Sequence, residues 1–177
     1  MKLDRERAAL LLIDVQEAFR KSVPAFDEVA AAVATLVRGA SELGVPVVVT
    51  EQYPKGLGAT VPEIAGHLPE TARRVEKVRF SASEADGFDL GGREQAIVCG
   101  IEAHVCVGQT VLDLLDAGTE VHLVADAIAS RDPGDAALAL RRAERAGATL
   151  TSVETVLFEL VRGSDAPEFK RVQELVL

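Results

Sequence analysis

The feature that most constrains this chain is a set of five short apolar runs in which apolar and polar residues do not alternate. They cover Ala8–Val15, Val45–Thr50, Gln95–Cys99, Glu120–Ala125 and Thr149–Ser152, and they are rich in Val, Ile and Leu. A strand with one face in water alternates, whereas continuous runs of this length are typical of strands covered on both faces. The pattern therefore predicts a sheet buried between helices.

Segments with helical spacing lie between and after these runs. They are Phe26–Leu43, Val105–Ala117, Asp135–Ala146 and Ala166–Val176, and the first three are each followed by glycine, a common helix stop. Because strands and helices alternate along the chain, the sequence predicts an α/β fold with right-handed crossovers. A length of 177 residues fits one domain, 1–177, built as a three-layer αβα sandwich around a doubly wound, Rossmann-type parallel sheet.

Charge and cysteine content narrow the classes of partner. The chain has 19 basic and 28 acidic side chains, for a net charge of -9, which disfavours binding to nucleic acid and to anionic membranes. Only two cysteines occur, Cys99 and Cys106, so we expect no disulfide framework and a reduced, cytoplasmic setting. No apolar run has the length of a membrane span or the pattern of a signal peptide.

Open parallel sheets bind ligands beyond the carboxyl ends of their strands, so the residues after each run are candidates for a site. Asp14 ends the first run and is either a general base or an ordinary strand-end aspartate. Cys106 follows the third run, where a helix is predicted to begin. A helix N-terminus stabilises a thiolate and can hold an oxyanion, but a small buried cysteine is the alternative.

Lys77 and His104 are weaker candidates. Lys77 lies between Val75 and Val78, and it is either a strand residue that points into the site or a solvated surface lysine. His104 precedes Cys106 by two residues, which leaves a Cys–His pair open. No G-x-G-x-x-G motif and no Walker A motif occurs, so dinucleotide and nucleoside-triphosphate binding lose their main support.

Three motifs together resemble a known family. They are Leu11–Gln16 with Phe19, Lys77 with Phe80–Ser81, and Gly100–Val107, and they occur in the family's order over almost the whole chain. The chain resembles the isochorismatase-like hydrolases, which include nicotinamidases, N-carbamoyl amidohydrolases and isochorismatases. A subgroup described as isochorismatase domain-containing is similar in further segments: Thr50–Gly58, Leu157–Phe158 and the tail around Pro167–Lys170.

The resemblance implies a six-stranded parallel sheet and a catalytic triad. In it Cys106 is the nucleophile, Asp14 takes its proton, and Lys77 is the cation that favours thiolate and carboxylate. The resemblance also implies a non-proline cis peptide at Ile101–Glu102 and an oxyanion hole made by the backbone N–H groups of Glu102 and Cys106. The expected substrate pocket is formed by Phe19, Gln52, Tyr53, Leu57 and Ile101.

Two departures from the family pattern guide the functional hypothesis. Metal-dependent nicotinamidases carry Asp-x-His after the second strand, where this chain has Glu51–Gln52–Tyr53, so we expect no metal and no other cofactor. True isochorismatases lack the catalytic cysteine. The sequence thus predicts a metal-independent cysteine hydrolase that cleaves a small amide or related carbonyl substrate through a thioester, and by resemblance a homo-oligomer.

Two alternatives belong to other classes. A phosphatase of the haloacid-dehalogenase type needs a second aspartate two residues after Asp14, but position 16 is Gln. A non-catalytic interaction protein that retains the fold is the second alternative. The reactivity of Cys106 discriminates, because a passive scaffold has no reason to lower the pKa of that thiol.

Overall fold

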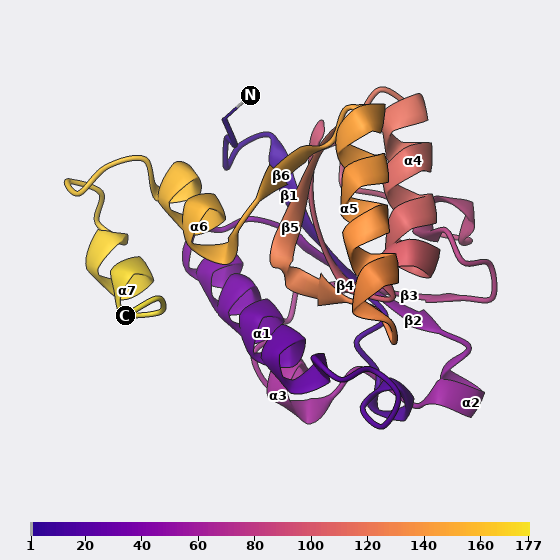
Figure 1. The fold of residues 1–177 in the computed structure, drawn as a ribbon. Helices are drawn as coiled ribbons and strands as arrows, with labels where there is room; N and C mark the ends of the chain where they lie inside the picture. Colours follow the sequence, from indigo (N-terminus) through magenta and orange to yellow (C-terminus); the bar gives the residue numbers. More distant parts are fainter. Residues whose placement is uncertain (1) are drawn as a thin grey trace.

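The computed structural model describes residues 2–177, and its strands form one six-stranded sheet in which every neighbouring pair is parallel (Figure 1). The strands are β1 (Ala8–Ile13), β2 (Val47–Gln52), β3 (Arg73–Lys77), β4 (Gln95–Ile101), β5 (Glu120–Ala129) and β6 (Thr149–Thr151). Their spatial order is β3-β2-β1-β4-β5-β6. The chain winds outward from β1 in one direction and then returns to wind in the other. The point of reversal, between the carboxyl ends of β1 and β4, is where such sheets bind ligands.

Each face of the sheet is covered by its own layer of helices, as the unalternating runs predict. In β1, Leu10 and Leu12 pack with α1, whereas Leu11 and Ile13 pack in the cluster on the opposite face. The first layer contains α1 (Phe26–Glu42), α3 (Pro62–Ala65), α6 (Val153–Val161) and α7 (Phe169–Gln173). The second layer contains α4 (Gly108–Asp116) and α5 (Pro133–Ala146), which lie side by side (Figure 1). The short helix α2 (Pro54–Leu57) follows β2 directly.

Local sequence signals explain the helix boundaries. Asp132 caps α5 by accepting a hydrogen bond from the Gly134 N–H at 2.7 Å, and Pro133 occupies the first helical position. The helix ends at Gly147, whose φ of 116° lies in the left-handed region that favours glycine. The predicted terminal helix is shorter than expected, because only Phe169–Gln173 is helical.

Two elements depart further from the sequence-based expectation. Strand β3 is absent from the five apolar runs because it lies at the sheet edge, where Arg73, Arg74 and Glu76 are exposed. The predicted helix Val105–Ala117 begins earlier, as a π-helical turn over Ala103–Val107 that continues into α4. Within residues 2–177, none of the helices combines the length and apolar character that crossing a membrane requires.

Gly100 makes the reversal point of the sheet possible. Its φ is 124°, and a Cβ placed there would overlap the backbone of Ile13 in the neighbouring strand. Any side chain at this position would push β4 away from β1. The glycine therefore brings the residues that follow the two strands close together.

Candidate active site

Asp14 and Lys77 form a buried ion pair at the carboxyl edge of the sheet. Lys77 Nζ lies 2.7 Å from Asp14 Oδ2, and both side chains have an exposed fraction of 0%. Asp14 follows β1 and Lys77 ends β3, so two strands that are not adjacent supply the pair. The structure therefore brings together two of the predicted catalytic residues, and of the two readings of Lys77 the surface lysine is wrong.

The remaining oxygen of Asp14 is held by a neighbouring strand. The hydroxyl of Thr50, in β2, donates to Asp14 Oδ1 at 2.7 Å, and Thr50 is fully buried. Asp14 itself has a φ of 52°, a left-handed conformation that is uncommon for residues other than glycine but accessible to aspartate. Both carboxylate oxygens thus have a donor, which offsets the cost of burying the charge.

The Lys77 ammonium group is saturated by the protein. It donates to Asp14 Oδ2, to Gln52 Oε1 at 2.7 Å and to the Phe80 carbonyl oxygen at 2.9 Å, with the Arg79 carbonyl oxygen further away at 3.4 Å. A lysine ammonium carries three N–H donors, and the three short bonds account for all of them. Lys77 therefore acts on its surroundings through its charge.

Gln52 and Gln16 fix the position of this lysine. The Gln52 side chain accepts from Lys77 and donates to the Val78 carbonyl oxygen at 2.9 Å. It therefore links the lysine side chain to the backbone of the next residue. Gln16 holds the Gln52 backbone in turn, accepting from its N–H at 2.8 Å and donating to its carbonyl oxygen at 3.0 Å. Gln52 was predicted to line the substrate pocket, but its amide is engaged here in positioning Lys77.

Cys106 lies in the π-helical turn between β4 and α4 and is 5% exposed. Burial raises the pKa of its thiol to about 12, and the charge of Asp14 together with a hydrogen bond to it acts in the same direction. Lys77 lowers that pKa through its charge, but it does not overcome the other two. The direction is opposite to the lowered thiol pKa that the sequence predicts, because burial and the like charge of Asp14 outweigh the Lys77 cation.

The first residues of the turn that carries Cys106 are held by the segment that follows β5. Glu102, at a cis peptide bond with Ile101 as the resemblance implies, accepts from Arg131 through its Oε2, at 2.9 Å from the backbone N–H and 3.0 Å from Nε. His104 Nδ1 lies 2.9 Å from Ser130 Oγ, and its Nε2 lies 3.6 Å from Asp135 Oδ2. These contacts place His104 in a network with Ser130 and Asp135.

The other predicted pocket residues differ in their surroundings. Ile101 is fully buried in the core cluster shared with α1, whereas Cys106 belongs to the cluster on the opposite face. Phe19 packs against the α1 side as well. Tyr53 is 55% exposed and, with Lys77, Val78 and Arg79, lines a cavity of about 560 Å³ beside β3. Leu57 is half-buried in α2.

Glu51, at the place compared above with the Asp-x-His pattern, binds Thr60. Its Oε1 accepts from the Thr60 backbone N–H at 2.7 Å and from the Thr60 hydroxyl at 2.8 Å, which ties down the loop after α2. Across the described part of the chain, residues 2–177, no three His, Cys, Asp or Glu side chains gather in a way that could hold a metal ion.

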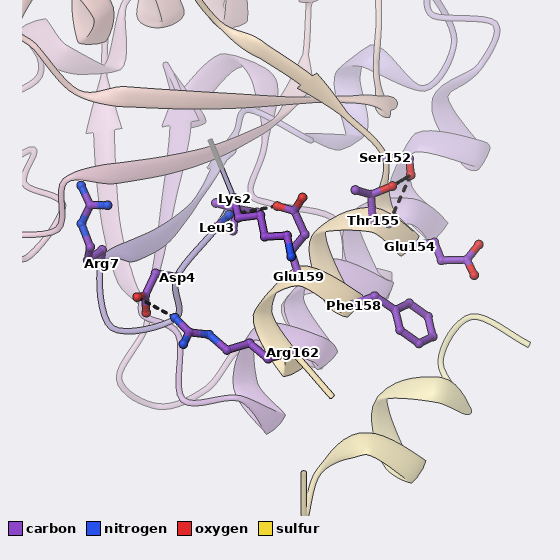
Figure 2. Close-up of a pocket in the computed structure, with 10 residues that line it drawn as sticks. All are labelled: Lys2, Leu3, Asp4, Arg7, Ser152, Glu154, Thr155, Phe158, Glu159 and Arg162. Carbon is purple, nitrogen blue, oxygen red and sulfur yellow. Dashed lines mark hydrogen bonds and ion pairs between the residues drawn. The ribbon is translucent and has the colours of Figure 1, made fainter. Parts of the chain in front are cut away.

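A larger hollow, of about 810 Å³, lies near the amino end of β1 (Figure 2). It is lined by charged side chains that include Asp4 and Arg162, which form an ion pair at 2.6 Å, and by Phe158. Glu159 accepts there from the Leu3 N–H at 2.9 Å. The hollow contains none of the residues discussed above, and its size alone does not make it a site.

The sequence missed Thr50 and the positioning roles of Gln16 and Gln52. Each follows or ends an apolar run, so its place in the chain was a usable signal, but only the register between β1 and β2 sets Thr50 beside the strand end that carries Asp14. Register between non-local strands cannot be read from spacing along the chain.

Comparison with known proteins identifies the family of this chain. Residues 8–155 match the family described as the isochorismatase domain. Isochorismatase domain-containing protein 2 of Xenopus laevis is 39% identical over 180 residues, covering 99% of this chain and 86% of that protein. The structure of the MAR1 ribonuclease from Caenorhabditis elegans is 40% identical with a TM-score of 0.94, covering 99% of this chain and 92% of that one. Escherichia coli YcaC, described as an octameric hydrolase of unknown specificity, is 26% identical with a TM-score of 0.87, covering 99% and 90%. This chain therefore belongs to the isochorismatase family and has the fold of an isochorismatase-family hydrolase.

Proposed function

We propose that this protein is a metal-independent cysteine hydrolase that cleaves a small amide or related carbonyl compound through a thioester on Cys106. The observation that carries the proposal is the fully buried Asp14–Lys77 pair, both members of which act on the Cys106 thiol. A charged pair without exposure is costly to keep in a fold, which favours a functional role for it.

The first half of the reaction forms the thioester. The Cys106 thiol gives its proton to the Asp14 carboxylate while sulfur attacks the carbonyl carbon of the substrate, and the π electrons of the C=O bond move onto oxygen. The backbone N–H groups of Glu102 and Cys106 would hold that oxyanion. The C–N bond then breaks, and the leaving nitrogen takes the proton from Asp14.

The second half returns the enzyme to its starting state. Water attacks the thioester carbonyl and gives a proton to Asp14, and the C–S bond then breaks as that proton returns to sulfur. Lys77 holds the Asp14 carboxylate in place through their ion pair, and its charge stabilises the developing thiolate. A thiol that is neutral at rest fits this scheme, because the proton moves only when a substrate is present to be attacked.

Two features of the site support independence from metal. Glu51 is engaged with Thr60, and Gln52 with Lys77, so neither is free to bind an ion without breaking a buried contact. We expect purified protein to contain no stoichiometric zinc or iron by elemental analysis. One ion per chain, with activity lost to chelators, would contradict this part of the proposal.

RNA cleavage is a second candidate, because the Caenorhabditis elegans relative is named a ribonuclease. The net charge of -9 works against binding to a phosphate backbone, so we favour a small neutral or weakly charged substrate. By analogy with the octameric YcaC relative, we also expect a homo-oligomer. The alternative of a non-catalytic interaction protein requires that Cys106 be dispensable.

The deciding experiment is a screen of small amides and ureides, read by ammonia release, with an RNA oligonucleotide in a parallel arm. For any substrate that is cleaved, mass spectrometry of a rapidly quenched reaction should show the acyl group on Cys106. Cys106→Ser and Asp14→Asn should abolish turnover, and Cys99→Ser, a matched change of the other buried cysteine, should retain it. Turnover that survives Cys106→Ser, or cleavage of RNA alone, would refute the proposal.

A further inference from the structure

Two adjacent residues after β5, Ser130 and Arg131, hold the start of the turn that carries Cys106. The Glu102 carboxylate is 8% exposed and accepts from Arg131 twice, at 2.9 Å from the backbone N–H and at 3.0 Å from Nε. His104 Nδ1 lies 2.9 Å from the hydroxyl of Ser130, which is buried. Because buried polar groups lose free energy when a partner is removed, these contacts restrain the backbone on which Glu102 and His104 lie.

The pairing of β4 with β5 explains why these residues meet. The register between the two strands shifts after Val98, and the next pair is Gly100 with Ile128, so β5 uses more residues than β4 over this interval. Such an irregularity redirects the residues that follow it, and it is common next to active sites. Ile101 then pairs with Ala129, the last residue of β5. The segments that follow the two strands therefore leave the sheet at the same place.

The other end of the turn is held by different residues. The hydroxyl of Thr110, in α4, donates to the Cys106 carbonyl oxygen at 2.7 Å and accepts from the Ala82 N–H at 2.8 Å. Thr110 is fully buried. Neither of these hydrogen bonds involves the segment after β5. If the contacts of that segment were weakened, the Glu102 N–H would therefore move while Cys106 stayed in place.

We propose that Arg131 and Ser130 are positioning residues, which keep the Glu102 N–H beside the Cys106 N–H by holding the side chains of Glu102 and His104. The inference rests on the proposed function, since it requires that these two N–H groups form the oxyanion hole. Donors stabilise a developing charge only when they are already in place as it forms. The supporting side chains set that position, and a small displacement of one donor is costly. Arg131 and Ser130 act through the turn and not on the substrate.

Two small amides, acrylamide and iodoacetamide, separate the positioning of the oxyanion hole from the reactivity of the thiol. With acrylamide, sulfur bonds to the terminal CH₂ carbon, the C=C π electrons shift until negative charge appears on the carbonyl oxygen, and a proton then adds to the carbon beside the carbonyl. With iodoacetamide, sulfur bonds to the CH₂ carbon and iodide leaves, so the carbonyl oxygen gains no charge. Both reagents consume the thiolate, so a change in the thiol pKa alters both rates by the same factor. The ratio of the acrylamide rate to the iodoacetamide rate therefore reports on the donors to the oxygen.

Substitutions after β5 should change this ratio in the full-length protein. Loss of an oxyanion-hole donor costs about 100-fold or more, so the displacement of one in Arg131→Met, which keeps the backbone N–H, should lower the ratio about tenfold. The rate with iodoacetamide alone should stay nearly unchanged. Arg131→Lys should recover part of the ratio, because it retains a cation for the Glu102 carboxylate. Ser130→Ala, which frees His104, should cause a smaller decrease. Arg141→Met, a matched change of an exposed arginine in α5, should have no effect on the ratio.

Mass spectrometry of the labelled peptides identifies the residue that reacts, and circular dichroism checks that each variant is folded. An unchanged ratio in both Arg131→Met and Ser130→Ala would overturn the inference. Rates that fall equally with the two reagents would also overturn it, because a general loss of structure or thiolate would explain them. Both of these results would leave Cys106 as the nucleophile. Turnover of a substrate that survives Cys106→Ser would instead refute the proposed function itself, and the oxyanion hole with it.

Discussion

One ion pair lies at the carboxyl ends of the strands and another lies near their amino ends. The two pairs differ in burial rather than in the distance between their charged atoms. At the carboxyl edge, Lys77 lies 2.7 Å from Asp14, and neither side chain is exposed. Near the amino edge, Arg162 lies 2.6 Å from Asp4, with side-chain exposures of 64% and 31% (Figure 2). Water screens the second pair, and the first must be satisfied by the protein alone. Burial, and not proximity, therefore separates a site from a surface contact.

The largest expected effect comes from removing one member of each pair. Lys77→Met leaves the Asp14 carboxylate buried and without a cation, so we expect a loss of about 3–5 kcal/mol in the free energy of unfolding. Arg162→Met, the matched change near the amino edge, should leave the urea midpoint almost unchanged because Asp4 stays hydrated. The double variant Asp14→Asn/Lys77→Met should recover part of the loss. Equal effects at the two edges would contradict the comparison.

A smaller effect follows from the hydrogen bonds around the pairs. Thr50→Val removes the donor to Asp14 Oδ1 and leaves a buried carboxylate oxygen without a partner, which should cost about 1–3 kcal/mol. Ser152→Ala near the amino-edge hollow removes a side chain that caps α6 in a setting open to water, and should cost about 1 kcal/mol or less. Urea unfolding of both variants measures the difference. If Ser152→Ala were the more destabilising change, the hydrogen bond from Thr50 to the Asp14 carboxylate would not be the larger contribution.

The sequence predicted most of the strands that carry these residues, and how well it did so differs from strand to strand. The runs at Ala8–Val15 and Gln95–Cys99 predicted buried strands correctly, because a parallel sheet leaves no face for polar residues. The same pattern did not predict the edge strand β3, because its residues Arg73, Arg74 and Glu76 are exposed and interrupt the apolar run. The motif containing Lys77 identified the residue only through the family resemblance, because its burial depends on contacts from β1 and β2.

The thiol pKa shows where sequence reasoning fails for the site. The sequence showed which charges would act on Cys106, but it could not weigh them. Burial is the largest cause of the shift, and it depends on how the π-helical turn packs between β4 and α4. A π-helix has no signal in the apolar periodicity of Val105–Ala117, so both the turn and the extent of burial had to come from the fold.

The rate of Cys106 alkylation distinguishes the effects of its two charged neighbours, Asp14 and Lys77, on the pKa of the thiol. Asp14→Asn removes a charge that raises the thiol pKa, so the rate of reaction with iodoacetamide at pH 7.5 should increase, by about tenfold for each unit by which that pKa falls. Lys77→Ala should decrease the rate. In the wild type the rate should keep rising with pH well above 9, because burial raises the pKa to about 12. Asp14→Asn should nevertheless lose turnover.

Cys99 provides the internal control for these rates. It lies within β4, is fully buried, and its pKa is raised by burial alone. Neither substitution should therefore change its reactivity, and Cys106 should react faster than Cys99 in the native protein. Should Asp14→Asn slow the alkylation of Cys106, the like-charge assignment would be wrong.

The smallest effect concerns the pH dependence of the exposed pair. The backbone N–H of Glu6 and the charge of Arg162 lower the pKa of the Asp4 carboxyl below its usual value of 3.8. A lowered acid pKa stabilises the fold above the unfolded-state pKa, and this contribution disappears as the pH falls through the folded-state value. Asp4→Asn should therefore cause a slight decrease in Tm at pH 7 that vanishes once the pH has fallen below the folded-state pKa of Asp4. The decrease should also be smaller in 1 M NaCl, because salt screens exposed charges. The destabilisation by Thr50→Val should be insensitive to salt, since no water reaches that carboxylate. A salt-sensitive Thr50→Val, or an effect of Asp4→Asn that grows on acidification, would contradict the assignment of burial as the difference between the two edges.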